Sequence, residues 1–191
     1  SWLESFILKE RSEENFSQLT NFVTIVVCSF LLILSAKIKV DLYPVPMTLQ
    51  PLAVLMIAML CGRNISVAAV SLYLFQGMIG IPVFAFGGGL PYLLGPTGGF
   101  LFGFLFASII IGEFADRGWG KTLLKSVFAM LIGMLVIYCC GILQLSILKG
   151  FNFAIINGLQ PFIIGDLYKI ILAALILPQI WKFVKKSKQI N

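Results

Sequence analysis

The sequence predicts an all-α integral membrane protein built as one bundle of six transmembrane helices. Of its 191 residues, 59% are hydrophobic and only 12% are charged, and the mean hydropathy is +1.00. Soluble domains carry about 25% charged residues, and a helix needs about 20 mostly apolar residues to cross a bilayer. Short basic, polar or glycine-rich segments divide the chain into about six apolar runs, which favours one membrane domain.

The first 19 residues are interpreted as an amphipathic, interfacial segment. Trp2, Leu3, Phe6 and Ile7 recur on one face of a helix, with glutamates between or after them. Such a helix lies in the headgroup region and leads into the first span. An ordinary surface helix is the alternative.

The next residues, 20–185, are predicted to form the membrane domain, followed by a basic cytoplasmic tail, 186–191. The predicted spans are Asn21–Ala36, Leu49–Cys61, Ile65–Ile79, Phe100–Phe114, Ser126–Leu148 and a last run from near Pro161 to before Lys182. The second and third runs are too short to cross unaided and are separated only by Gly62-Arg63-Asn64. They predict a hairpin of tilted or incomplete helices.

Three connections are expected to lack regular structure. Tyr43–Gln50 is stiffened by two prolines, Gly80–Gly99 is rich in glycine and proline and carries no charge, and Lys149–Gln160 is a mixed polar and apolar loop. Irregular backbone near membrane depth is tolerated only where it is buried in protein or lines a cavity. The first two segments and the beginning of the last span are expected to converge, which favours a pocket at one end of the bundle.

The distribution of basic residues predicts the orientation. With six spans, one side collects ten basic residues: Lys9, Arg11, Arg63, Arg117, Lys121, Lys125, Lys182, Lys185, Lys186 and Lys188. The other side collects three, Lys37, Lys39 and Lys149. Cytoplasmic loops are enriched in lysine and arginine. Both termini are therefore predicted to be cytoplasmic, with the pocket opening outward.

An acid and a base stand out in the last apolar run. Asp166 and Lys169 lie three residues apart and so share one face of a helix. A charged residue near the bilayer centre costs roughly 2.5–3.5 kcal/mol on insertion scales. Two interpretations compete: a structural ion pair buried between helices, and a polar ligand site inside the bundle.

The Gly80–Gly99 segment supplies the other candidate site residues. Its aromatic residues Phe84, Phe86 and Tyr92 offer flat apolar walls, and its glycines permit tight turns and close approach to a ligand. We expect ligand contact at Gly88 and a lid formed by Gly87, Gly89, Pro96 and Thr97. A plain membrane-surface loop is the alternative.

Several functional classes find little support. The chain has no histidine, its four cysteines lack metal-ligand spacing, and no nucleophile with a base or paired carboxylates indicates catalysis. The basic residues adjoin apolar runs, which argues against nucleic acid and for a lipid bilayer as partner. Gly120-Lys121-Thr122 lacks the preceding strand and glycine of a phosphate-binding loop. No ATPase, metal site or cofactor is therefore predicted.

Four motifs resemble one known family. They are Pro44-Val-Pro46-Met-Thr48-Leu49-Gln50, Ile81-Pro82-Val83-Phe84, Tyr92-Leu-Leu-Gly95-Pro96-Thr97-Gly98-Gly99 and Pro161-Phe-Ile-Ile-Gly165-Asp166-Leu-Tyr-Lys169. In this order and spacing, over about residues 20–185, they resemble BioY, the biotin-specific S-components of energy-coupling-factor (ECF) transporters.

The resemblance implies a six-helix S-component in the bacterial cell membrane that binds biotin from outside. It implies as partners a transmembrane coupling protein and two cytoplasmic ATPases. Asp166 and Lys169 match the family's ligand-contacting acid and base, and the glycine-rich loop matches the segment that closes over the ligand. From the chemistry of biotin, we expect Tyr43 or Gln50 to add a hydrogen bond from the first outer loop. The open alternatives are an S-component for another vitamin, a stand-alone carrier or channel, and a membrane enzyme.

One feature departs from the family pattern. Its members present two alanines four residues apart on the first span for docking to the coupling protein, whereas this chain has Thr24 and Cys28. Small residues at this spacing still permit close helix packing. We expect these two positions to form the docking face.

Overall fold

Helices make up almost all of the computed structural model, which describes the backbone of residues 2–188 and the side chains of residues 17–180. In chain order the elements are α1 (Trp2–Lys37), β1 (Lys39–Val40), β2 (Met47–Thr48), α2 (Gln50–Met78), α3 (Leu90–Leu94), α4 (Gly98–Asp116), η1 (Trp119–Lys121), α5 (Leu123–Lys149), α6 (Phe151–Gly158) and α7 (Gln160–Lys188). The predicted all-α membrane fold is confirmed. Among the described residues, the one regular sheet is the short antiparallel hairpin of β1 and β2.

Five helices are long and apolar enough to cross a membrane. They are α2, α4 and α5 in full, Ser17–Lys37 of α1 and Gln160–Ile180 of α7. Their outer faces carry exposed apolar side chains, such as Phe22 on α1 and Leu135 on α5. Because backbone groups within each helix are hydrogen-bonded internally, such faces can lie against lipid. The chain is a multi-pass membrane protein.

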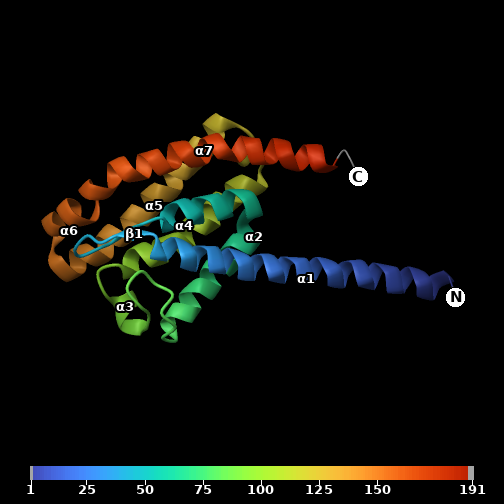
Figure 1. Cartoon of the computed structure of the whole chain (residues 1–191), viewed down its shortest axis with the longest axis horizontal. Coiled ribbons are helices and arrows are strands. Elements are labelled where there is room, and N and C mark those ends of the chain that lie inside the picture. Colours follow the sequence, from blue (N-terminus) through green and yellow to red (C-terminus); the bar gives the residue numbers. More distant parts are fainter. Residues whose placement is uncertain (1, 189–191) are drawn as a thin grey trace.

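The second and third predicted runs both fall within α2. Its helical geometry is interrupted at Gly62, where φ is 76° and ψ is −177°, a conformation that is essentially restricted to glycine. Figure 1 shows the chain turning sharply there, so that the two arms of α2 run in different directions. The break lies where the sequence placed the turn between two short helices.

A carboxylate on α4 stabilises the start of the second arm of α2, just after the break. Asp116 Oδ2 accepts a hydrogen bond of 3.2 Å from the backbone N–H of Arg63, the first residue of the second arm. The first N–H groups of a helix lack intrahelical partners, so Asp116 acts as a cap supplied by another helix. A Cβ at Gly62 would lie 2.2 Å from Asp116 Oδ1. The site therefore needs glycine for its space as well as for its dihedral angles.

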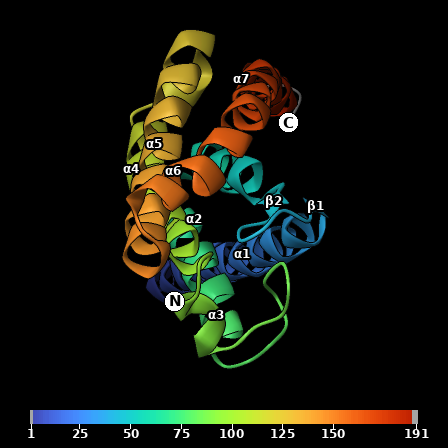
Figure 2. The same ribbon diagram turned by 90° about the vertical axis from the view of Figure 1, so that its left-hand side faces the viewer.

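Helix α4 packs against both α2 and α5, and Figure 2 shows it running alongside α5. A Cβ at Gly112 would lie 2.4 Å from Arg63 Cα on α2, and one at Gly103 would lie 2.9 Å from Ile137 Cα on α5. Small residues allow close approach of helix backbones in membranes, where van der Waals packing drives association. Two glycines on different faces of α4 therefore bring three helices together at the centre of the bundle.

The prediction of an irregular loop at Lys149–Gln160 is wrong, because most of this segment forms the helix α6. Ala154 and Gly158, four residues apart, are buried on one face of α6, and a Cβ at Gly158 would lie 2.8 Å from Leu145 Cδ2 on α5. Packing of this small-residue face against α5 gives the short helix its stability. The Gly80–Gly99 segment likewise contains the five-residue helix α3.

The N-terminal part of α1 and the C-terminal part of α7 extend toward the same end of the molecule (Figure 1). Helix α1 continues from Trp2 into the first span without interruption. The side chains of the predicted amphipathic face (Trp2, Leu3, Phe6 and Ile7) and of the basic tail lie outside the described residues. At the opposite end are the β1–β2 hairpin, α6 and the start of α7.

We predict that Gly62→Ala lowers the free energy of unfolding by at least about 2 kcal/mol, because a Cβ meets both an unfavourable φ and the Asp116 carboxylate. Thermal unfolding in detergent micelles measures this as a fall in Tm of at least about 4 °C. Gly150→Ala is the matched control, since its φ of 90° and ψ of 154° also favour glycine, but an added Cβ would have no neighbour within 4 Å. Equal losses for the two variants would show that the contact with Asp116 has no role.

Candidate ligand-binding site

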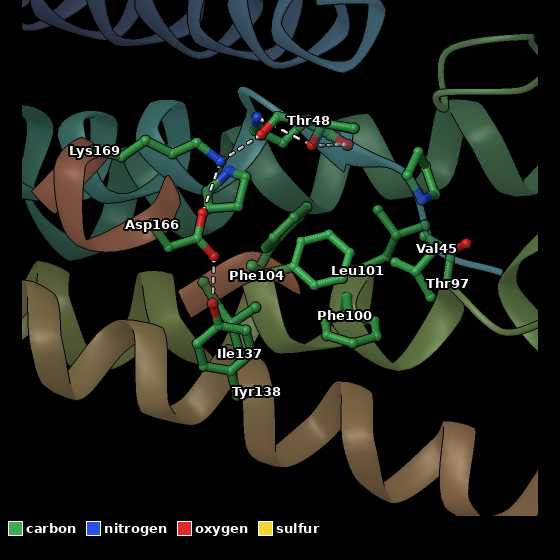
Figure 3. A pocket seen from close by; sticks show the side chains of 14 residues that line it. Val45, Thr48, Thr97, Phe100, Leu101, Phe104, Ile137, Tyr138, Asp166 and Lys169 are labelled. Carbon is green, nitrogen blue, oxygen red and sulfur yellow. Dashed lines mark hydrogen bonds and ion pairs between the residues drawn. The ribbon is translucent and has the colours of Figure 1, made fainter. Parts of the chain in front are cut away.

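A cavity of about 40 Å³ lies at the end of the bundle that carries the β1–β2 hairpin (Figure 3). Its walls come from the hairpin, the starts of α2 and α4, and the facing sides of α5 and α7. The lining residues are Val45, Pro46, Thr48, Gln50, Pro51, Thr97, Phe100, Leu101, Phe104, Ile137, Tyr138, Phe162, Asp166 and Lys169. Most are apolar and a few converging ones are polar, as is typical of small-molecule sites.

The polar edge of the cavity is centred on Asp166, which is only 3% exposed. Lys169 Nζ lies 2.7 Å from Asp166 Oδ1 and also donates to the backbone carbonyl of Thr48 at 2.9 Å. The hydroxyl of Tyr138 on α5 donates to Asp166 Oδ2 at 2.5 Å. Figure 3 shows these contacts as a continuous chain from Thr48 through Lys169 and Asp166 to Tyr138.

This arrangement combines features of both interpretations of the acid and base. The two side chains bond to each other, as a structural ion pair requires, and both also border the cavity, as a ligand site requires. A carboxylate has about four lone-pair sites, and the two protein donors occupy one on each oxygen of Asp166. Asp166 therefore retains capacity to accept hydrogen bonds from a ligand.

A second polar group reaches the cavity from the start of α2. Gln50 is 3% exposed, and its side-chain amide donates to the Tyr73 hydroxyl at 2.6 Å. Its backbone N–H donates to Thr48 Oγ1 at 3.2 Å. Gln50, at the start of the first arm of α2, is thus held by Tyr73 on the second arm and by Thr48 in the hairpin, which fixes the direction of its side-chain carbonyl oxygen.

The structure brings four of the sequence-predicted residues to the cavity: Asp166, Lys169, Gln50 and Thr97. Thr97 immediately precedes α4. Gly87, Gly88, Gly89 and Pro96 are not among the lining residues.

The predicted aromatic residues lie elsewhere. Phe84 is fully buried in the core, where its ring lies 5.5 Å from Tyr73 and stacks on Tyr92 at 5.0 Å. Phe86 is 54% exposed and lies beneath the ammonium group of Lys39, while Tyr43 is 79% exposed. Burial raises the pKa of the Tyr92 hydroxyl above its ordinary value. None of these four predicted residues (Tyr43, Phe84, Phe86 and Tyr92) lines the cavity.

Two side chains anchor the glycine-rich segment to the bundle. Lys37, the last residue of α1, donates to the carbonyls of Pro82 and Phe84 at 2.8 and 2.6 Å. On α5, the side-chain amide of Gln144 donates to the carbonyls of Leu93 and Gly95 at 3.0 and 2.7 Å. The second anchor adjoins the start of α4, so it supports the wall that carries Thr97.

The sequence interpretation missed Tyr138, Thr48 and the apolar wall formed by Phe100, Leu101 and Phe104. A tyrosine within an apolar run was a possible signal for Tyr138, because a buried hydroxyl needs a partner. Thr48 contributes a backbone carbonyl, for which residue type gives no signal.

The predicted docking positions do not form an outward face. Cys28 is 5% exposed and its Sγ lies 3.9 Å from Cys61 Sγ on α2. Thr24 is half-buried, and its hydroxyl donates to the carbonyl of Thr20 within α1. The exposed face of α1 is lined instead by larger apolar residues such as Phe22, Val26 and Phe30.

Comparison with known proteins identifies the family. A family model described as the BioY family matches residues 9–186. The chain belongs to the BioY family. The resemblance drawn from the four sequence motifs is therefore confirmed.

Named relatives and a solved structure agree with this membership. A BioY relative from Pyrococcus horikoshii, described as a probable biotin transporter, is 39% identical over 142 residues and covers 74% of this chain and 83% of the relative. The biotin transporter BioY of Thermotoga maritima is 38% identical over 153 residues, covering 76% and 86%. A crystal structure of the S-component for biotin from an ECF-type ABC transporter superposes with a TM-score of 0.78 at 25% identity, covering 88% of this chain and 94% of that one.

We predict that Gln144→Leu in this BioY chain loosens the segment from Leu93 to Thr97. Leucine fills a similar volume but cannot donate to the two loop carbonyls, and buried acceptors left unpaired cost about 1–3 kcal/mol each. Hydrogen exchange by mass spectrometry should show the amides of Gly95 and Gly98, which are hydrogen-bonded within this segment, exchanging at least about tenfold faster.

Asn157→Leu is the control, because its amide donates to Phe153 within α6, away from the cavity. Unchanged exchange in Gln144→Leu, or an equal change in Asn157→Leu, would contradict the anchoring role.

Proposed function

We propose that this chain binds biotin and mediates its uptake across the cell membrane as the substrate-specific subunit of an ECF-type transporter. The observation that carries the proposal is the buried pair of Asp166 and Lys169 at the edge of an otherwise apolar cavity, in a chain of the BioY family. The described relatives are biotin transporters, and the solved S-component is one for biotin.

The chemistry of biotin suits the residues that line the cavity, which would widen from its volume of about 40 Å³ to hold the whole molecule. Its ureido ring has two N–H donors and a carbonyl acceptor, its thioether ring is apolar, and its tail ends in a carboxylate. Asp166 and the Gln50 carbonyl would accept from the ureido N–H groups, while Lys169 would donate to the ureido oxygen or to the tail. Phe100 and Phe104, which line the cavity, would pack on the bicyclic ring.

The glycine-rich segment would act as a support and lid for this site. Phe84, stacked on Tyr92, would hold the segment in the core, and Gly87 and Gly89 would allow its tip to turn tightly through their positive φ angles of 133° and 101°. Tyr43, Phe86 and Gly88 would reach a ligand only if the outer loops rearrange.

We further propose six membrane crossings, with both arms of α2 crossing and both termini in the cytoplasm. The break at Gly62 supports two arms, and four basic residues lie at helix ends or in connections on the proposed cytoplasmic side: Arg63, Arg117, Lys121 and Lys125. The side chains of Lys9, Arg11, Lys182, Lys185, Lys186 and Lys188 lie outside the described residues. The cavity would then open outward from a bacterial cell membrane.

The proposed partners are a transmembrane coupling protein and two cytoplasmic ATPases, which would supply the energy for transport. The similarity to the S-component of an ECF-type ABC transporter supports this assembly. The role proposed for this chain is ligand binding and transport without catalysis or a resident cofactor. The docking face would lie on α1, where Thr24 and Cys28 would need neighbouring exposed residues to complete it.

We predict that Asp166→Asn weakens biotin binding at least tenfold, about 1.4 kcal/mol, while the protein still inserts. Asparagine keeps the size of the side chain but has one acceptor oxygen, and it leaves Lys169 without its counter-ion. Equilibrium dialysis with labelled biotin measures the affinity, and competition with other unlabelled vitamins separates biotin from another vitamin as the ligand.

The matched control is Asp41→Asn, which removes a carboxylate paired with Lys39 at the exposed surface. It should leave the affinity within about twofold, because exposed pairs contribute little. Unchanged biotin affinity in Asp166→Asn would refute the assigned role. Uptake into liposomes without added ATPases would favour a stand-alone carrier.

A further inference from the structure

Two thiols from different helices meet in the interior between α1 and α2. Cys28 Sγ lies 3.9 Å from Cys61 Sγ, and Cys28 is only 5% exposed. Cys61 is the last residue before the break at Gly62. A disulfide bond is about 2.05 Å long, so both thiols are free, as are Cys139 and Cys140.

The donor set limits which ligands fit this pair. Among the described residues, no group of three or more histidine, cysteine, aspartate or glutamate side chains is placed to hold a metal ion. Structural zinc sites use four protein ligands, and calcium and magnesium prefer oxygen. Two sulfur atoms alone suit a soft cation that accepts two ligands.

The membrane setting favours a metal-bound site that has no net charge. Both cysteines lie within candidate spans, Ser17–Lys37 and Gln50–Met78, where a net charge is costly. Two thiolates with one divalent cation give a neutral group. On binding, each S–H bond breaks as a sulfur–metal bond forms, and two protons leave for the solvent per cation.

We propose that Cys28 and Cys61 form a dithiol site for soft divalent cations of the mercuric type, which would bridge α1 to the first arm of α2. Neither sulfur lines the central cavity, so the site is separate from the proposed biotin site and does not rest on it. The bridge would fasten α1 to an arm that begins at Gln50, a cavity residue.

The chain contains its own control for this site. Cys139 and Cys140 are adjacent on α5, and neighbouring residues on a helix do not face each other. The variant Cys139→Ser/Cys140→Ser keeps only the proposed pair, and adding Cys28→Ser to it leaves Cys61 alone. If that triple variant fails to fold, Cys61→Ser in place of Cys28→Ser gives the same comparison.

The test titrates the whole chain in detergent micelles with mercuric chloride. The bound ions are counted by native mass spectrometry and the remaining thiols by a chromogenic reagent. The Cys139→Ser/Cys140→Ser variant should bind one ion and lose both thiols together. Glutathione should be needed at a concentration at least about tenfold higher to remove this ion than to remove one from the single-cysteine variant, because the second sulfur binds intramolecularly.

Two ions per chain in Cys139→Ser/Cys140→Ser, or removal at the same glutathione concentration in both variants, would overturn the proposal. Either result would mean that the two sulfur atoms bind metal independently of each other.

Discussion

The structure depends on keeping an acid and an amine paired inside a bilayer. Removing one partner of a buried ion pair leaves an uncompensated charge and costs about 3–5 kcal/mol, so Asp166 and Lys169 constrain the segments around them. Tyr138 brings α5 to the pair, and the carbonyl of Thr48 brings the β1–β2 hairpin to it. One polar cluster thereby joins three parts of the chain and places a small cavity beside them.

The rest of the bundle holds that cluster in place. Glycines on α4 allow it to approach α2 and α5 closely, which positions Phe100 and Phe104 on α4 opposite Asp166 on α7 (Figure 3). At the other end of α4, Asp116 caps the second arm of α2. The polar contact of Asp116 thus ties one end of α4 to α2, while small residues along its length fix its distance from the neighbouring helices.

The sequence pointed to residues that line the cavity where a residue was chemically unusual for its surroundings. Asp166 and Lys169 were conspicuous as charges in an apolar run, and the family motifs drew attention to Gln50 and Thr97. Aromatic residues did not stand out from their surroundings in this way, because they are apolar like most of the chain. Phe84 was expected at the ligand but fills the core against Tyr73, while Phe100 lines the cavity without having been singled out.

By itself the sequence determined the all-helical membrane class, most of the apolar runs, the turn at Gly62 and the presence of a buried charged pair. These follow from hydropathy and backbone preference, which depend on residues close together along the chain. Only the tertiary structure decided which aromatic residues face the cavity, that Cys28 meets Cys61, and that Lys169 reaches the carbonyl of Thr48, 121 residues away. The physical reason is that such partners are chosen when whole helices pack together, and residue type carries little information about that packing.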